Sequence, residues 1–182
     1  MSELQAAANP AVIEVEGSID QPWDQFILKH QDGIEIAAVE RNPVAEGKLG
    51  AEEIEEFLEE IPLHQPQSAV TWLVNYLRRV KVIYAFQLLS GTEVNDGWTP
   101  LHHVYNTVWK FAGGILQADG EGFSNEDGAS ILWQFSDSVS GAWNVGVLNG
   151  NQWVHFEMEL GDRQHREAFW AGQVPAGAKI IT

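Results

Sequence analysis

Residues 143–160 carry the clearest fold signal in the chain and read WNVGVLNGNQWVHFEMEL. Apolar and polar residues alternate on both sides of Asn149-Gly150, and a period of two is typical of β-strands with one buried face. Asn-Gly is the strongest short signal for a tight turn between antiparallel strands. The stretch therefore predicts a β-hairpin, in which a two-residue turn at Asn149-Gly150 sets Asn144 opposite His155.

The alternation separates two faces of the predicted sheet. The apolar face, which we expect to cover the core, carries Ile131, Trp133, Phe135, Trp143, Val145, Val147, Val154, Phe156, Met158 and Leu160. The opposite face carries Gln134, Asn144, Gly146, Trp153, His155, Glu157 and Glu159. Because successive side chains of a strand point to opposite sides, this second face is either open to water or the wall of a binding site.

Two more strand-like runs, 115–119 and 131–135, precede the hairpin, so the last third of the chain predicts a four-strand antiparallel meander. Amphipathic helices are predicted over 50–61, where apolar residues recur every three to four positions, and from Pro66 to Arg79. The chain thus predicts an α+β fold with helices packed on one face of an antiparallel sheet. In layout this resembles the curved sheets of cystatin-like and NTF2-like proteins.

The N-terminal part has weaker signals. Residues 1–10 predict a flexible tail, and we expect residues 11–182 to form a single domain because no Pro-, Gly- or Ser-rich linker interrupts them. Residues 18–30 predict a short helix. Residues 98–112 fit either a helix or a strand, since β-branched residues occur there at helical spacing. Further strands are predicted at 11–16, 34–40 and 80–89.

The charge of the chain excludes several classes of function. The 182 residues include 26 acidic and 10 basic side chains, a formal net charge of −16, and no cysteine. Nucleic acids and anionic membranes are bound by basic surfaces, so neither is an expected partner. Without cysteine there is no thiol catalysis and no disulfide or thiolate metal site. No apolar run reaches the length of a membrane span and the N-terminus lacks signal-peptide features, so we expect a cytoplasmic, bacterial protein.

Acidic residues concentrate in the first third of the chain. Residues 1–62 hold 15 of the 26 acidic residues and 3 of the 10 basic ones. The helix predicted over 50–61 carries Glu52, Glu55, Glu56 and Glu59. Like charges four residues apart lower helix stability, so repulsion between these glutamates makes this helix less stable. The arrangement predicts an acidic surface for a basic protein partner, with a plain solvated face as the alternative.

The polar sheet face is the candidate ligand site. Its predicted members are Gln134, Asn144, Trp153, His155 and Glu157. An aromatic platform, a titratable pair and amide donors are common contents of a small-molecule pocket. His155 beside Glu157 would also suit a general base oriented by a carboxylate, but we assign no catalytic residue.

No metal or cofactor is expected. The acidic loop 119–128 does not fit an EF-hand, because Ser124 stands where the obligatory glycine would be, and looser calcium binding there stays open. The histidines lack the i,i+4 spacing of helical zinc sites, and no phosphate-binding or hydrolase motif occurs.

The sequence thus predicts a non-catalytic interaction module that engages a basic protein through its acidic N-terminal third. The alternative is a small-molecule-binding protein or minor enzyme with a pocket around Trp153, His155 and Glu157. Exposure of Trp153 or Trp170 would favour a homo-oligomer, and the sequence leaves the oligomeric state open.

Overall fold

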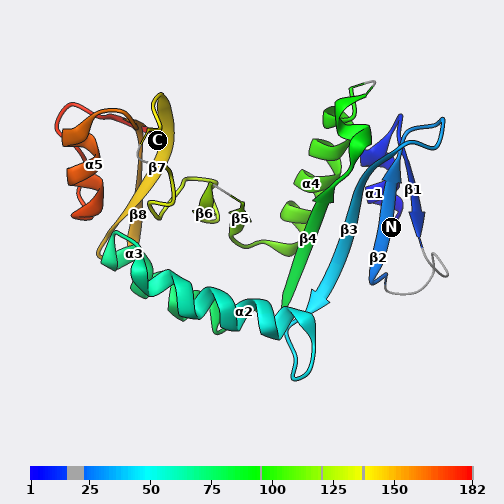
Figure 1. Cartoon of the computed structure of the whole chain (residues 1–182), viewed down its shortest axis with the longest axis horizontal. Helices are drawn as coiled ribbons and strands as arrows, with labels where there is room; N and C mark the ends of the chain where they lie inside the picture. Colours follow the sequence, from blue (N-terminus) through cyan, green and yellow to red (C-terminus); the bar gives the residue numbers. More distant parts are fainter. Residues whose placement is uncertain (16–22, 95, 120, 137, 182) are drawn as a thin grey trace. The chain divides into compact units, whose positions relative to one another are not determined.

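The computed structural model describes residues 1–15, 23–94, 96–119, 121–136 and 138–181 (Figure 1). The chain folds into two compact units, each built from two separate segments. The first unit comprises Met1–Glu53 and Val80–Gly113, and the second comprises Ile54–Arg79 and Gly114–Thr182. Both combine helices with antiparallel strands, so the predicted α+β class is confirmed. The expectation of a single domain over 11–182 stays a prediction that an unfolding experiment can test.

The first unit is a four-stranded antiparallel sheet of order β1-β2-β3-β4 with two helices. Its strands are β1 Val12–Val15, β2 Gln25–Lys29, β3 Glu35–Pro43 and β4 Val82–Leu88. Its helices are α1 Ser2–Ala8 and α4 Trp98–Ala112, with a short 3-10 turn, η2, at Ser90–Glu93. Figure 1 shows α4 beside β4 and α1 behind the strands. The strands predicted at 11–16, 34–40 and 80–89 are confirmed.

The core of the first unit lies between the sheet and its helices. Phe26 and Leu28 of β2 pair with Val39 and Ala37 of β3, so all four side chains point to the same side of the sheet. They pack with buried residues of both helices in one cluster. The helical members are Leu4 and Ala8 of α1 and Leu101, Val104 and Val108 of α4. Spacings of three and four residues place these side chains on one face of each helix.

The N-terminal residues differ from the sequence-based expectation. Instead of a flexible tail over 1–10, the chain forms α1, whose Leu4 and Ala8 are buried in the core cluster. A helix this short is unstable in isolation, so it depends on packing against distant residues. Local sequence contains no sign of that packing.

Two other assignments in this unit are settled by the structure. The helix predicted over 18–30 is wrong at 25–29, where β2 forms, and its part up to residue 22 lies outside the described residues. Two apolar residues two apart, Phe26 and Leu28, give too short a pattern to separate the two periods. The alternatives left open for 98–112 resolve to the helix α4.

The second unit contains a three-stranded antiparallel sheet of order β7-β8-β9 and a two-stranded hairpin, β5-β6. Its strands are β5 Leu116–Ala118, β6 Gly122–Ser124, β7 Ala142–Asn149, β8 Gln152–Glu159 and β9 Lys179–Ile181. Its helices are α3 Gln67–Leu77, α5 Arg163–Trp170 and the part of α2 (Leu49–Glu60) after Glu53, with a 3-10 turn, η1, at Ile61–Leu63. The two predicted amphipathic helices are confirmed as α2 and α3. Of all the helices described, none has the length and apolarity needed to cross a bilayer.

The predicted apolar face of the β7-β8 hairpin is confirmed. Val145, Phe156 and Met158 are fully buried and pack in one cluster with Phe169 of α5. Trp133, Phe135 and Trp143 are partly buried and pack around that cluster. Alternation therefore assigned the buried side of these strands correctly, because the pleat alone decides which side chains share a face.

The four-strand meander predicted for the last third is wrong in detail. Residues 131–135 form no strand: the Ile131 N–H donates to the Phe123 carbonyl and the Trp133 N–H donates to the Gln65 carbonyl. The third strand of the sheet is instead β9, which pairs with β8. Apolar alternation predicts that side chains are buried, but it does not say which backbone supplies the hydrogen bonds.

The register of the β7-β8 hairpin also differs from the prediction. Asn149 pairs with Gln152, so the two-residue turn is Gly150-Asn151 and Gly146, not Asn144, lies opposite His155. Gly150 has φ of 62°, and a positive φ at the first central position is where type II′ turns require glycine. Moving the turn by one residue shifts each pairing by two positions, which leaves every side chain on its predicted face.

Candidate functional site

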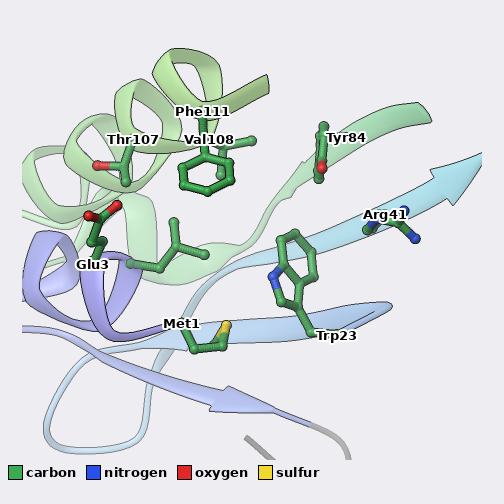
Figure 2. A pocket seen from close by; sticks show the side chains of 9 residues that line it. Met1, Glu3, Trp23, Arg41, Tyr84, Thr107, Val108 and Phe111 are labelled. Atoms are coloured by element: carbon green, nitrogen blue, oxygen red, sulfur yellow. The ribbon is translucent and has the colours of Figure 1, made fainter. Parts of the chain in front are cut away.

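A cavity of about 170 Å³ lies in the first unit, on the helix-covered side of its sheet (Figure 2). Residues of α1, β3, β4 and α4, with Trp23 ahead of β2, line it: Met1, Glu3, Leu4, Trp23, Arg41, Tyr84, Thr107, Val108 and Phe111. Most of these side chains are apolar or aromatic, with a few polar groups among them. That mixture is usual in small-molecule sites.

Strand alternation brings a charged side chain to the core side of the sheet. Arg41 follows Val39 by two residues, so it lies on the face of β3 that carries the core. Its cross-strand partner is Tyr84, which packs against the core cluster. Both residues line the cavity, which therefore begins where the apolar part of this face ends.

Aromatic rings form much of the cavity wall. The Trp23 ring centroid lies 4.9 Å from that of Phe26 and 5.8 Å from that of Tyr84. Edge and tilted contacts of this kind hold rings in defined orientations. Phe111 lines the cavity from α4 although its side chain is 83% exposed. Its ring is apolar surface that a molecule bound in the cavity would cover.

The two polar groups Arg41 and Thr107 differ in how firmly the rest of the protein holds them. Arg41 Nη1 lies 3.9 Å from Asp24 Oδ1, beyond hydrogen-bond length, and the Asp24 side chain is 87% exposed. Thr107 Oγ1 donates a hydrogen bond of 2.8 Å to the His103 carbonyl. A long, exposed ion pair contributes little stability, so Arg41 can exchange Asp24 for another anion at small cost.

The ligand residues predicted in the second unit include two neighbours on one face of β8. Trp153 packs edge-to-face on Trp72 of α3, with ring centroids 5.0 Å apart. His155 Nε2 lies 2.9 Å from Asn125 Nδ2 and 3.6 Å from Asp127 Oδ2. These contacts come from α3 and from the loop after β6, and sequence reasoning identified neither.

The other three predicted members have partners elsewhere. Glu157 Oε2 lies 3.4 Å from Lys179 Nζ of β9, and Asn144 is the cross-strand partner of Glu157. Gln134 Oε1 accepts a hydrogen bond of 3.2 Å from the Phe123 N–H. The predicted side chains thus belong to separate sets of contacts, and a ligand site among them stays a prediction.

An aromatic cluster accompanies Trp153 in this unit. Trp72 stacks on Tyr76, one helical turn further along α3, with ring centroids 5.0 Å apart. Burial raises the pKa of Tyr76, and the Glu126 carboxylate raises it further. The rings are in direct contact with one another, so we read the cluster as packing that joins α3 to β8.

The acidic residues predicted for partner binding are exposed on α2. Glu52, Glu55, Glu56 and Glu59 all face solvent. Within the described parts of the chain, no basic side chain comes within 4.0 Å of these four carboxylates. At the end of this helix, Glu60 Oε1 lies 3.8 Å from His64 Nε2. Glu52 belongs to the first unit and the other three to the second.

The described residues contain no group of three or more histidine, cysteine, aspartate or glutamate side chains placed to hold a metal ion. Comparisons with protein-family models, curated proteins and solved structures give no match. The resemblance in layout to cystatin-like and NTF2-like sheets therefore stays a prediction.

Sequence reasoning missed the cavity of the first unit because its lining comes from segments far apart in the chain. A usable local signal was Arg41, a charged residue two positions after Val39 in a strand whose residues 36–39 are all buried. A charged residue on the core-facing side of a strand lies either at the edge of the core or beside a cavity.

Proposed function

We propose that the protein is a non-catalytic binding protein for a small, largely apolar molecule, which it takes up in the cavity of the first unit. One observation carries this proposal: the aromatic and aliphatic side chains around the cavity leave about 170 Å³ unfilled. The cavity is open to solvent at Glu3 and Phe111, which are both exposed, and a space of about 150 Å³ is enough to bind benzene.

We infer binding without chemistry because the aliphatic hydroxyl of the cavity, that of Thr107, is not activated. A nucleophilic hydroxyl needs a base that accepts its proton. Thr107 donates instead to the backbone carbonyl of His103, which cannot take a proton. The remaining polar groups, Glu3, Arg41 and Tyr84, suit recognition and orientation of a ligand.

The test is binding of a small apolar probe, p-xylene, followed by NMR shifts of backbone amides and by thermal unfolding. We expect shifts centred on the cavity and a higher Tm, since a ligand at 100 times its Kd adds about 2.7 kcal/mol to the unfolding free energy. The variant Val108→Phe fills the cavity from α4 and should abolish both effects. Thr107→Phe fills it from a half-exposed position, should Val108→Phe fail to fold.

Val94→Phe is the matched control, because it adds the same ring at an exposed position outside the cavity. It should leave binding of the probe unchanged. Binding that survives both filling variants would place the site elsewhere, and absence of binding to the unaltered protein would refute the proposal.

A second function, engagement of a basic protein partner, is favoured by the exposed glutamates of α2, whose carboxylates have no basic side chain within 4.0 Å among the described residues. The variant Glu52/Glu56/Glu59→Gln should then lose a basic partner that the unaltered protein retains at low salt and releases at high salt. Glu46/Glu93/Glu121→Gln changes the net charge equally at other exposed sites and should retain the partner. If both variants lose the partner equally, binding depends on the net charge of the protein and not on the α2 surface.

A further inference from the structure

The polar groups of the cavity lie at two ends, with hydrogen-bond donors at one end and acceptors at the other. Figure 2 places Arg41 and Tyr84 together at the strand side, and Glu3 and Thr107 together at the helix side. Leu4, Val108 and Phe111 belong to the apolar lining. From this sorting, and on the basis of the proposed function, we propose that the ligand is dipolar: a carboxylate at Arg41, a protonated amine at Glu3 and Thr107, and one ring-sized apolar body between them.

The strand side of the cavity supplies hydrogen-bond donors. A guanidinium group has five N–H donors and no acceptor, in a planar arrangement that fits a carboxylate. The present partner of Arg41 is Asp24, whose oxygen is 3.9 Å away and whose side chain extends into solvent. A ligand carboxylate at hydrogen-bond distance would form charge-assisted bonds, which are shorter and stronger. The neighbouring Tyr84 hydroxyl can add one more donor.

The helix side supplies acceptors. The Thr107 hydroxyl donates its one hydrogen bond to the His103 carbonyl at 2.8 Å. Toward the cavity its oxygen can therefore only accept hydrogen bonds. The Glu3 carboxylate is also an acceptor and carries a negative charge. Two acceptors together call for a ligand group with several hydrogens and a positive charge, which an ammonium group provides and a second carboxylate does not.

The two ends should not contribute equally. Arg41 is the more enclosed, with 32% of its side chain exposed, whereas Glu3 is solvent-exposed. Charged contacts weaken as solvent screens them. We therefore expect the carboxylate to add more affinity than the amine, and the volume of about 170 Å³ to limit the body to a single ring.

Four ligands with one para-substituted benzene body separate these contributions. They are 4-(aminomethyl)benzoate with both charges, 4-methylbenzoate with the anion, 4-methylbenzylamine with the cation, and p-xylene with neither. Affinities are measured at pH 7 by NMR titration of the full chain without an N-terminal tag, because Met1 lines the cavity. We expect the dipolar ligand to bind most tightly, then the anion, the amine and p-xylene in that order.

Two variants assign each charge to its partner. Arg41→Gln should weaken binding of both carboxylate ligands about 10- to 100-fold and leave the other two unchanged. Glu3→Gln should weaken binding of both amine ligands about 2- to 5-fold and leave the other two unchanged. Arg78→Gln and Glu93→Gln make the same charge changes at exposed positions outside the cavity, and should alter none of the four affinities.

The outcomes separate this inference from the proposed function. If all four ligands bind alike, the cavity takes apolar molecules and the dipolar ligand is refuted. If 4-methylbenzoate binds as tightly as the dipolar ligand, the amine site at Glu3 and Thr107 is refuted. If Arg41→Gln weakens p-xylene as much as the carboxylates, Arg41 acts on the shape of the cavity and not on an anion. If no ligand binds the unaltered protein, the proposed function fails with it.

Discussion

The side-chain amide of Asn125 and the ring of His155 lie 2.9 Å apart, from Nδ2 to Nε2. Asn125 is fully buried, and its Oδ1 accepts hydrogen bonds from the N–H groups of Asp127, at 3.1 Å, and Ala129, at 3.0 Å. With Oδ1 occupied in this way, Nδ2 faces His155 and donates to Nε2. The neutral ring therefore carries its proton on Nδ1.

We therefore expect Asn125 to stabilise the loop after β6 through the two hydrogen bonds that its side chain accepts from loop N–H groups. Asn125→Ala would leave the buried Ala129 N–H without its acceptor, and we expect the unfolding free energy to fall by about 2 kcal/mol in urea titrations. Asn75→Ala, at an exposed position of α3, is the control and should change stability by less than about 0.5 kcal/mol. Similar losses from the two substitutions would contradict this role.

The hairpin register predicts different effects at two adjacent turn residues. Gly150 has φ of 62°, so Gly150→Ala should lower the unfolding free energy by about 1 kcal/mol. Asn149 pairs with Gln152 inside the ladder, and Asn149→Ala should have a smaller effect. Thermal unfolding of both variants tests this. The reverse order of effects would favour the Asn149-Gly150 turn that the sequence alone predicted.

The start of α5 predicts a pH-dependent contribution to stability. Asp162 caps this helix by accepting from the N–H groups of His165 and Gln164, and these two hydrogen bonds hold its pKa below the ordinary value. A lowered pKa in the folded state means that the stabilisation is complete above the ordinary pKa, near 4, and is lost as pH falls through the lower folded-state value.

Asp162→Asn keeps a side-chain acceptor and removes the charge. We expect the unaltered protein to have the higher Tm at pH 7, and the difference to close as pH falls below about 4. Comparing the two proteins at each pH removes the shared effect of the other 25 acidic residues, which is the total of 26 less Asp162. A Tm difference that stays constant down to pH 2.5 would contradict the capping role.

In the loop before α4, the close approach of Gly97 to other backbone atoms requires glycine at that position. A Cβ on Gly97 would overlap the Gly91 carbonyl oxygen, although Gly97 has an ordinary φ of −62°. Gly97→Ala should therefore lower the unfolding free energy by about 2 kcal/mol through displacement of backbone. In the control Gly161→Ala the new Cβ meets the side chain of Ser140, and a smaller loss is expected. Unchanged stability of Gly97→Ala would contradict the close approach.

The two units allow the single-domain prediction to be tested directly. Each unit is assembled from two segments separated by residues of the other, so we expect both to unfold in one transition. Fluorotryptophan signals from Trp98 and Trp109 report on the first unit, and those from Trp143 and Trp170 report on the second. Two distinct urea midpoints would show that the units are separate domains.

Local patterning was sufficient for the helices α2 and α3 and for the two faces of the β7-β8 hairpin. The glutamate-rich helix α2, the helix α3, and the strands β3, β4, β7 and β8 agree with what the sequence predicted. A period of 3.6 or 2 reflects side-chain burial within one segment, so it can be found without knowledge of the rest of the chain. The acidic surface of α2 was predicted in the same way.

Features that depend on distant partners could not be found in this way. Helix α1 exists because α4 and the sheet bury Leu4 and Ala8, and residues 131–135 leave the sheet because their N–H groups find other acceptors. Gln134 and Asn144 were therefore placed wrongly relative to His155. Hydrogen-bond partners and register are relations between segments, and patterning within one segment does not determine them.

The sequence by itself determined the α+β class, the net charge and the buried side of the strands β7 and β8. Tertiary structure alone decided that Arg41 and Tyr84 meet Glu3 and Thr107 around one cavity, because those residues come from two strands and two helices. Whether a side chain is buried or exposed follows a pattern within one segment, because apolar groups avoid water. A cavity forms where side chains from several segments leave space between them, so it depends on how those segments pack.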